Sequence, residues 1–299
     1  MTKPPITKPP SDSAIAVAIA PETQQLITLW LHGKSRHTRR YYRRDAERFL
    51  QFADAPLNEL DAMDVQRFFD HLEGERLAPS SLGRTIAAIK SFLKFAHQMG
   101  VNPNNIGSAF KVPSSKDTLS ERILTREEVL ALIDHASSDR NRVMLRMLYS
   151  CGLRVSELCG LQWRDLRSRQ DGGQVTIYGK GNKTRVVLIP ASVWQDLHTL
   201  KEKRPTPPTR TTPVFPSRKG GGALDPSQIM RIVRQAARTA GLEANISPHW
   251  LRHAHASHSL DRGAPIHLVQ NTLGHSSVAT TGRYLHARPQ DSSSKYLDL

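Results

Sequence analysis

The chain has 299 residues, which is enough for two compact domains that each bury their own core. Lys and Arg number 42 against 27 Asp and Glu, so the formal net charge is +15. This excess predicts a polyanionic partner: nucleic acid, an anionic membrane surface or a heparin-like polymer. No stretch approaches the roughly 18 apolar residues of a membrane span, so we expect no membrane-embedded segment.

The first 20 residues are rich in Pro, Ser and Ala, and we expect a disordered leader over 1–20. Its apolar patch, 14–20, is at the short end of the roughly 7–15 apolar residues of a secretory signal, so a disordered arm is favoured over a signal peptide. Cys151 and Cys159 are too few for a disulfide scaffold and lack zinc-site spacing. Buried free thiols in a reducing cytoplasm are the favoured interpretation.

Residues 21–112 have helical apolar spacing throughout. Leu26, Ile27, Trp30 and Leu31 begin the pattern, and three further groups of aromatic and aliphatic residues continue it. We therefore predict four helices with short connections, forming a small all-helical domain without strands.

A basic segment lies early in this domain and carries mostly arginine. Its basic residues are Lys34, Arg36, Arg39, Arg40, Arg43, Arg44 and Arg48. Asp45 and Glu47 oppose them, and Arg84 and Lys90 follow on a later helix. A charge run is usually a solvated face. Here the arginine excess favours contact with DNA phosphates, because a guanidinium is a planar fork of donors.

A polar segment, 113–121, is predicted to be an interdomain linker, and a second, mainly helical domain is expected over 122–288. Thr125 with Glu127 and Glu128 predicts a helix start. The remaining expectations follow in chain order: a long apolar helix over 142–161 broken around Gly152, a β-hairpin of 174–178 and 184–189, a surface loop over 201–222, helices over 226–240, about 248–261 and about 265–273, and a polar tail over 289–299.

Two basic residues of the second domain are candidates for chemistry. Arg154 follows the glycine that interrupts the apolar helix, and Glu157 could orient its guanidinium, since a buried arginine is costly without a partner. Lys180 lies at the predicted hairpin tip, where a flexible lysine could reach a cleft and protonate a leaving oxygen. Taken singly, each is better explained by an ordinary structural or solvated role.

Four further candidates lie near the end of the domain. His249 and Arg252, three residues apart, share a helix face and could clamp a phosphate. His253, four residues after His249, raises the possibility of zinc, but the Glu of a His-Glu-x-x-His site is absent, so no metal is expected. His275 follows a helix end marked by Gly274. Tyr284 comes nine residues later and alone is typical of a core residue.

Together these residues form the ordered set Arg154, Lys180, His249, Arg252, His275 and Tyr284 in a basic chain. The chain resembles the tyrosine recombinases of the phage-integrase family, and among them the Xer-type and the integron or phage integrases. The motifs that carry the resemblance over about 21–288 are Ser-x-His-Thr-x-x-x-Tyr at 35–42, Gly-Leu-Arg-x-x-Glu-Leu at 152–158, Gly-Lys-Gly-x-Lys at 179–183, His-x-Leu-Arg-His at 249–253, and a Leu-Gly-His…Tyr motif at 273–284. Trp250 departs from the polar residue common in relatives.

The resemblance implies a mainly α fold, with a SAM-like helical core-binding domain and an α+β catalytic domain that contains a small β-hairpin sheet. It implies that Tyr284 attacks a phosphodiester and forms a 3′-phosphotyrosine. Arg154 and Arg252 would bind the phosphate oxygens, His249 would accept or relay the phenolic proton, His275 would donate to the phosphate, and Lys180 would protonate the leaving oxygen. No cofactor and no metal are expected.

The implied partner is double-stranded DNA, bound by a tetramer of this chain or of this chain with a paralogue; no membrane and no small-molecule substrate are expected. Tyr296 and Leu297 of the tail are candidates for docking on a neighbouring subunit. Alternatives are a catalytically silent DNA-binding relative, a metal-dependent nuclease or transposase, and a topoisomerase of similar chemistry. A missing site residue would favour the first, three spaced carboxylates the second, and cleavage without sequence preference the third.

Overall fold

The computed structural model describes residues 19–113, 118–179, 184–217, 220–242 and 245–287. The predictions for the leader (apart from residues 19 and 20), for Lys180 and for the tail concern residues outside these ranges. The chain divides into two compact units, Met1–Lys116 and Asp117–Leu299. Within the described parts of both units, no helix is long and apolar enough to cross a membrane.

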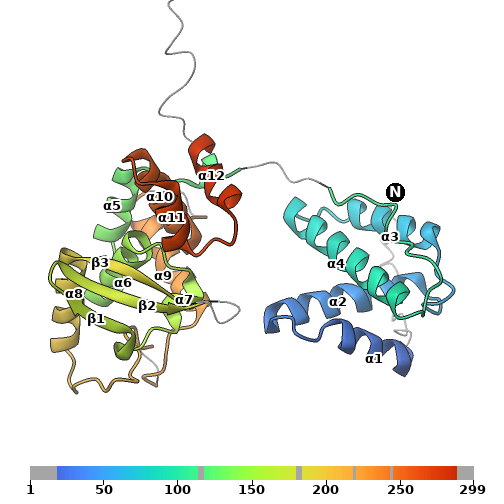
Figure 1. The fold of residues 1–299 in the computed structure, drawn as a ribbon, viewed down its shortest axis with the longest axis horizontal. Helices are drawn as coiled ribbons and strands as arrows, with labels where there is room; N and C mark the ends of the chain where they lie inside the picture. Colours follow the sequence, from blue (N-terminus) through green and yellow to red (C-terminus); the bar gives the residue numbers. More distant parts are fainter. Residues whose placement is uncertain (1–18, 114–117, 180–183, 218–219, 243–244, 288–299) are drawn as a thin grey trace, which may run out of the picture. The chain divides into compact units, whose positions relative to one another are not determined.

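The first unit is a four-helix domain, as predicted (Figure 1). Its helices are α1 (Pro21–Trp30), α2 (Arg36–Ala53), α3 (Ala62–Gly74) and α4 (Pro79–Gln98). Ser35 caps α2 by accepting a hydrogen bond from the backbone N–H of Thr38 at 3.2 Å. Phe49, Phe68 and Phe92 are fully buried between the helices, so aromatic packing forms this core.

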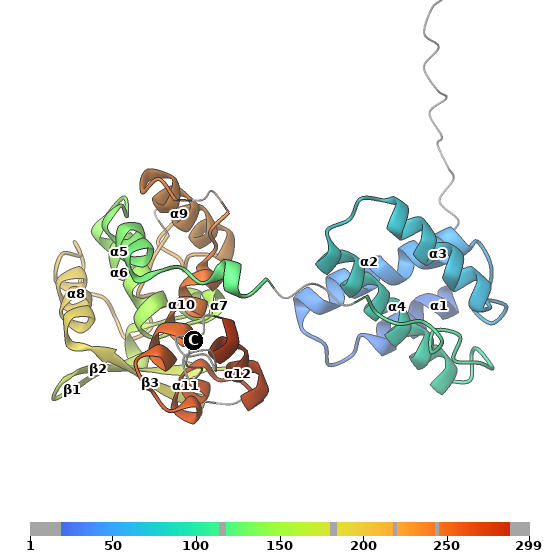
Figure 2. The ribbon, with the colours of Figure 1, turned by 90° about the horizontal axis from the view of Figure 1, so that it is seen from above.

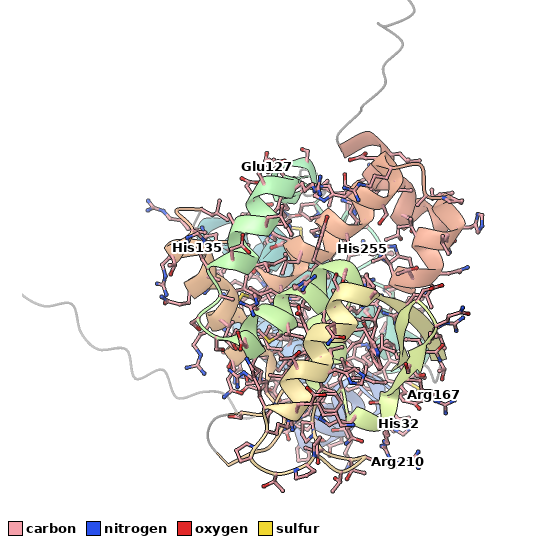
Figure 3. All side chains as sticks on the ribbon, turned by 90° about the vertical axis from the view of Figure 1, so that its left-hand side faces the viewer. His32, Glu127, His135, Arg167, Arg210 and His255 are labelled. Atoms are coloured by element: carbon pink, nitrogen blue, oxygen red, sulfur yellow. The ribbon has the colours of Figure 1, made fainter. Side chains whose placement is uncertain are left out.

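The second unit is a helical domain with one small sheet. Its helices are α5 (Arg126–Asp134), α6 (Asp139–Ser150), α7 (Val155–Cys159), α8 (Ala191–Glu202), α9 (Pro226–Thr239), α10 (Pro248–Asp261), α11 (Ile266–Leu273) and α12 (Val278–Ala287). Thr125 and Glu128 form the expected capping box at the start of α5. Figure 3 labels Glu127 and His135 at the two ends of this helix. The sequence patterns did not predict α8 or α12.

The sheet has three antiparallel strands in the order β1-β2-β3. They are β1 (Leu166–Arg169), β2 (Gly172–Tyr178) and β3 (Thr184–Pro190). The predicted hairpin is confirmed as β2 and β3, with Tyr178 opposite Thr184 at its end. Strand β1 is an addition to the prediction: only Leu166 of its four residues is buried, so the segment has no apolar alternation to detect.

The predicted break at Gly152 is confirmed between α6 and α7. Gly152 has φ +58°, a left-handed conformation that favours glycine. A Cβ atom there would lie 2.8 Å from side-chain atoms of both His255 and Leu273. The break therefore lets α10 and α11 approach the backbone between α6 and α7. The two views in Figures 1 and 2 show α10 beside α11 and α12, and the candidate site lies where these helices meet.

Candidate active site

Helix α10 carries three of the polar side chains that line a cleft against α12. His249, Arg252 and His253 follow each other at intervals of three and one residues, which puts them on one side of the helix. They line a cleft of about 210 Å³ together with Leu119, Arg154, His275, Thr280, Arg283 and Tyr284. Five of the six candidate residues thus converge on one cleft. The sixth, Lys180, lies outside the described residues.

Arg252 is a buried cation, only 2% exposed. It donates to the carbonyl oxygen of Gly152 through Nη1 and to that of Leu273 through Nη2, the latter at 2.6 Å. Burial first, and Arg154 second, lower the pKa of Arg252 to about 10. The guanidinium therefore stays charged at neutral pH and brings a permanent cation to the bottom of the cleft.

Arg154 reaches the cleft from the start of α7, where Glu157 holds it. Its Nη1 donates to Oε1 of Glu157 at 2.9 Å, and its Nη2 donates to the carbonyl oxygen of Gly274 at 3.1 Å. Its side chain keeps 37% exposure, which leaves it accessible to a ligand. The expected pairing of Arg154 with Glu157 is present in the structure.

Glu157 also binds a second arginine, Arg185 of β3. Nη1 and Nη2 of Arg185 donate to the two carboxylate oxygens of Glu157 at 2.9 and 2.8 Å. Its Nε donates to the carbonyl oxygen of Thr272 at 2.8 Å. The pKa of the Glu157 carboxyl is lowered, because the hydrogen bonds and charges of Arg185 and Arg154 outweigh the burial that would raise it. This network ties β3, α7 and the end of α11 together.

His275 follows the left-handed C-cap of α11 at Gly274, where φ is +65°. Its Nδ1 lies 2.9 Å from Oγ1 of the buried Thr281. Its ring stacks parallel to that of Tyr284 with 6.4 Å between centroids. Burial, followed by Arg252 and Arg154, lowers the pKa of His275 to about 4. A neutral His275 with one nitrogen engaged by Thr281 keeps its other nitrogen for a ligand.

Tyr284 is almost completely buried, at 5% exposure. Its hydroxyl lies 2.8 Å from Nδ1 of His253, and the ring centroids are 5.7 Å apart. Burial raises the pKa of Tyr284, although Arg252 and Arg283 act in the opposite direction. We expected His249 beside this hydroxyl, whereas the hydrogen-bonded imidazole is His253. His249 lies one contact further out, its ring edge-on to that of His253 at 4.9 Å.

The imidazoles of α10 share a cationic environment. Burial, His249 and Arg252 lower the pKa of His253 to about 3. Desolvation in the cleft, Arg252 and Arg154 likewise lower the pKa of His249, although its side chain is exposed on the open side. These histidines are therefore neutral near pH 7. Within the described residues, no group of three or more His, Cys, Asp or Glu side chains is arranged to hold a metal.

The cleft continues into a larger hollow of about 830 Å³, since both are lined by Arg154, His275 and Thr280. Tyr178 and Gly179, at the end of β2, also line this hollow. Gly179, the residue that precedes Lys180 in the sequence, therefore lies in the wall of this hollow. The cysteines lie elsewhere as free thiols, and burial raises the pKa of Cys151 to about 12.

Two further basic surfaces are present, one in each unit. On α2, Arg36, Arg39, Arg40 and Arg44 are exposed. On α9, Arg231, Arg234 and Arg238 follow at intervals of three and four residues, and with Arg140 they line a hollow of about 760 Å³. Both helices present arginine to solvent, as the net charge predicted.

Comparison with protein families identifies the chain. Residues 122–291 match the phage integrase family, and residues 24–100 match the N-terminal SAM-like domain of phage integrases. The chain belongs to the phage integrase family, whose members are tyrosine recombinases.

Two curated relatives place the chain near the Xer recombinases. It is 34% identical over 260 residues to tyrosine recombinase XerC of Xanthomonas campestris pv. campestris, covering 84% of this chain and 79% of the relative. It is also 34% identical over 262 residues to tyrosine recombinase XerA of Pyrococcus furiosus, covering 86% and 85%. The predicted Xer-like membership is confirmed.

Solved structures confirm the fold. A XerA recombinase crystal structure matches with 28% identity and a TM-score of 0.53, covering 92% of this chain and 99% of that one. The structure of XerH bound to its palindromic difH substrate after cleavage matches with 21% identity and a TM-score of 0.74, covering 92% and 84%. The predicted mainly α fold with a SAM-like domain and a small sheet is therefore confirmed.

Sequence reasoning missed three residues of the site. The sequence pattern suggested His253 only as a possible zinc ligand. Its position four residues after His249 places both side chains on one helix face, and this spacing was a signal that His253 also belongs to the site. Arg185 and Arg283 carried no signal beyond their charge. Arg185 meets Glu157 across 28 positions of sequence, a pairing that requires the fold.

Proposed function

We propose that this chain is a site-specific recombinase that cuts and rejoins double-stranded DNA through a covalent 3′-phosphotyrosine at Tyr284. The observation that carries the proposal is the single cleft that Tyr284 shares with the other four candidates of the described residues, Arg154, Arg252, His249 and His275. A free phenol titrates near pH 10 and is a poor nucleophile at neutral pH, so it needs a cationic site and a proton acceptor. Both are present around Tyr284.

The chemistry assigns a role to each candidate. Arg154 and Arg252 bind the non-bridging oxygens, where negative charge builds up in the transition state. His275 donates a hydrogen bond to the same phosphate, and His249 takes part in the transfer of the phenolic proton. Lys180 protonates the departing 5′-oxygen.

Two consequences follow from this arrangement. Because guanidinium groups supply the charge that metal ions supply in many phosphoryl-transfer sites, the proposed reaction needs no divalent ion. Because the phosphotyrosine conserves the energy of the broken bond, the reaction needs no ATP. A free 5′-hydroxyl of another strand attacks the phosphotyrosine, releases Tyr284 and completes the exchange.

DNA is the proposed partner of both basic surfaces. The exposed arginines of α2 and the arginines of α9 suit phosphate contacts, which fix position on a duplex without reading sequence. XerH is described bound to its difH substrate, and a lambda integrase dimer bound to a core site shares this fold with a TM-score of 0.72 and 18% identity. These neighbours support a duplex DNA partner for this chain.

Strand exchange between two duplexes needs four cleavages, so we propose a tetramer on DNA, of this chain alone or with a paralogue. The tail is the proposed link between subunits, through Tyr296 and Leu297, which lie outside the described residues. A DNA substrate and free thiols both fit action in the cytoplasm. Truncation after Pro289 should abolish tetramers on DNA in native mass measurements; intact tetramers would contradict the docking role.

The test of the reaction is covalent capture in EDTA. Fragmented genomic DNA of the host is incubated with the protein, denatured in detergent, and the protein-linked fragments are sequenced to find the shared site. A nicked duplex of that site should then trap an adduct with the wild type and none with Tyr284→Phe.

Three other results of the covalent capture would contradict part of the proposal. An adduct that persists in Tyr284→Phe contradicts the nucleophile, and an adduct that needs Mg²⁺ contradicts the metal-free mechanism. Sequence-specific binding without any adduct supports the catalytically silent relative.

A further inference from the structure

The hydrogen bond between Tyr284 and His253 is the feature of the cleft that the proposed roles leave unused. Oη of Tyr284 and Nδ1 of His253 are 2.8 Å apart, a short, well-formed contact between the reacting atom and a ring nitrogen. His253 lies on α10 and Tyr284 on α12, so the contact forms only when the two helices pack.

The two groups are matched as donor and acceptor. A neutral imidazole has one protonated and one free nitrogen, and a protonated phenol has one proton to donate. Burial among cations keeps His253 neutral, and burial keeps Tyr284 protonated. The Tyr284 O–H can therefore donate to Nδ1 of His253, with the His253 proton on Nε2.

We propose that Nδ1 of His253 takes the phenolic proton of Tyr284 during strand cleavage. The Tyr284 O–H bond breaks, its proton moves to Nδ1, and the oxygen forms a bond to phosphorus. The bond from phosphorus to the 5′-oxygen breaks, and that oxygen takes a proton from the general acid, so charge and atoms balance. The reverse steps release the tyrosine. This inference rests on the proposed function of Tyr284 as nucleophile.

His249 has a secondary place in this arrangement. Its ring meets His253 edge-on with 4.9 Å between centroids, and it is exposed where His253 is half-buried. It is one contact removed from the phenol, on the solvent side. His249 can therefore exchange protons with water at the open side of the pair, beside His253.

Because cations surround His253, a bound phosphate should raise its affinity for a proton. The groups that face it are His249 and Arg252 on α10, Arg122 before α5, and Arg283 and Tyr284 on α12. The cations among them oppose protonation in the DNA-free protein. A phosphodiester bound by Arg252 and Arg154 brings negative charge that offsets them and favours the imidazolium. The proton acceptor thus becomes effective when the phosphate arrives.

The test uses two substitutions at His253 and a matched control. His253→Asn keeps a polar acceptor near the position of Nδ1 but cannot be a base at neutral pH, whereas His253→Ala removes both functions. The control is His258→Asn on the same helix, because Nδ1 of His258 lies 2.9 Å from the hydroxyl of Tyr149. The measurement is the rate of adduct formation on the nicked duplex from the covalent capture.

We expect both His253 variants to cleave about 10²–10⁴-fold more slowly at pH 7, the usual range for a lost general base. His258→Asn should stay within about twofold of the wild type, because it preserves an acceptor outside the cleft. The deficit of the His253 variants should shrink as pH approaches 10, where the phenol begins to ionise without a base. Added imidazole should partly restore His253→Ala. A purely structural role would alter neither the pH profile nor the response to imidazole.

A His253→Asn variant that cleaves at the wild-type rate would overturn the proposal, because a hydrogen bond alone would then suffice. A deficit that is equal at every pH and insensitive to imidazole would overturn it as well. If His253→Ala does not fold, as judged by its melting curve, the Asn variant decides alone. These outcomes differ from failure of the proposed function, in which the wild type forms no adduct or Tyr284→Phe still forms one.

Discussion

Two histidine–tyrosine pairs lie along α10, and they are nearly identical as pairs. Nδ1 of His253 is 2.8 Å from the Tyr284 hydroxyl, and Nδ1 of His258 is 2.9 Å from the Tyr149 hydroxyl. The ring centroids are 5.7 and 5.8 Å apart. The pairing of a phenol with an imidazole therefore does not by itself distinguish a reacting tyrosine from a structural one.

The difference lies in what surrounds each pair. Arg154 and Arg252 line the cleft beside Tyr284. Arg262 and Arg126 influence Tyr149 only by charge at a distance, and the carboxylate of Glu127 interacts with His258. Cations gathered around one pair can stabilise a phosphate and its transition state, whereas a mixed surface around the other cannot. The chemistry thus comes from the arginines that the fold brings to Tyr284.

The largest expected difference in cleavage rate comes from removing one arginine near each histidine–tyrosine pair. Arg154→Ala should lower the rate of adduct formation by about 10²–10³-fold, as for loss of one donor to a developing negative charge. Arg262→Ala, beside the other pair, should stay within about twofold. Single-turnover rates on the nicked duplex measure both. Equal losses in the two variants would break the comparison.

The second-largest effect is expected at Glu157, whose carboxylate binds both Arg154 and Arg185. Glu157→Gln should destabilise the protein by about 3 kcal/mol, because it leaves Arg185 and Arg154 without their buried counter-charge. The folded pKa of Glu157 is lowered, so its contribution is present above the unfolded pKa of about 4.3 and is lost as pH falls through the folded value. Denaturant unfolding at pH 7 and pH 3 should show that the difference in stability between Glu157→Gln and the wild type is smaller at pH 3. Asp196→Asn, which breaks the half-exposed pair with Arg146, is the control and should cost about 1 kcal/mol or less.

The neutral imidazole of the reacting pair predicts a pH dependence of stability. The folded pKa of His253, about 3, lies below the unfolded value of about 6.5, so the unfolded chain binds more protons and stability falls as pH drops below 6.5. Between pH 7 and pH 5, His253→Asn should therefore lose about 1–2 kcal/mol less stability than the wild type. Unfolding curves at the two pH values measure this, and parallel losses would show that His253 binds its proton equally well in both states.

The smallest effect is expected at the structural pair. Tyr149→Phe removes the hydroxyl bonded to His258 and should cost about 1 kcal/mol of stability, typical of one hydrogen bond. Adduct formation should stay within about twofold of the wild type. A melting curve and a cleavage assay on the same preparation test both statements, and a large loss of cleavage would mean that the two pairs act together.

The sequence predicted the helices and the hairpin wherever apolar spacing or caps were strong. The break at Gly152 and the capping box at Thr125 are examples, since each depends on a few adjacent residues. Helix α12 was missed because its segment contains Gly282 and two threonines, which are weak helix formers. The burial of Thr281 and Tyr284 against α10 and α11 compensates for this, and such packing is not visible in a local window.

The candidate site was predictable to the extent that its residues belong to ordered motifs. Arg154, Arg252, His249, His275 and Tyr284 do line one cleft. Their roles were harder to predict, because the partner of Tyr284 depends on how α12 packs on α10. His253 and His249 are one turn apart, and only the docked position of Tyr284 distinguishes them.

The hydrogen bonds that Arg185 donates to Glu157 and Thr272 bear on when, during synthesis and folding, the chain acquires its activity. This one guanidinium binds Glu157 and Thr272, partners 28 and 87 positions away, and Arg154 meets Gly274 across 120 positions. Contacts of such separation cost more loop-closure entropy than local ones, so a fold that depends on them forms slowly. A nascent chain that has released α6 and α7 but not α11 lacks the carbonyl oxygens of Thr272 and Gly274, which accept from these two arginines. The capacity to break DNA therefore depends on α11 and α12, which are synthesised after the elements that carry Arg154 and Arg185.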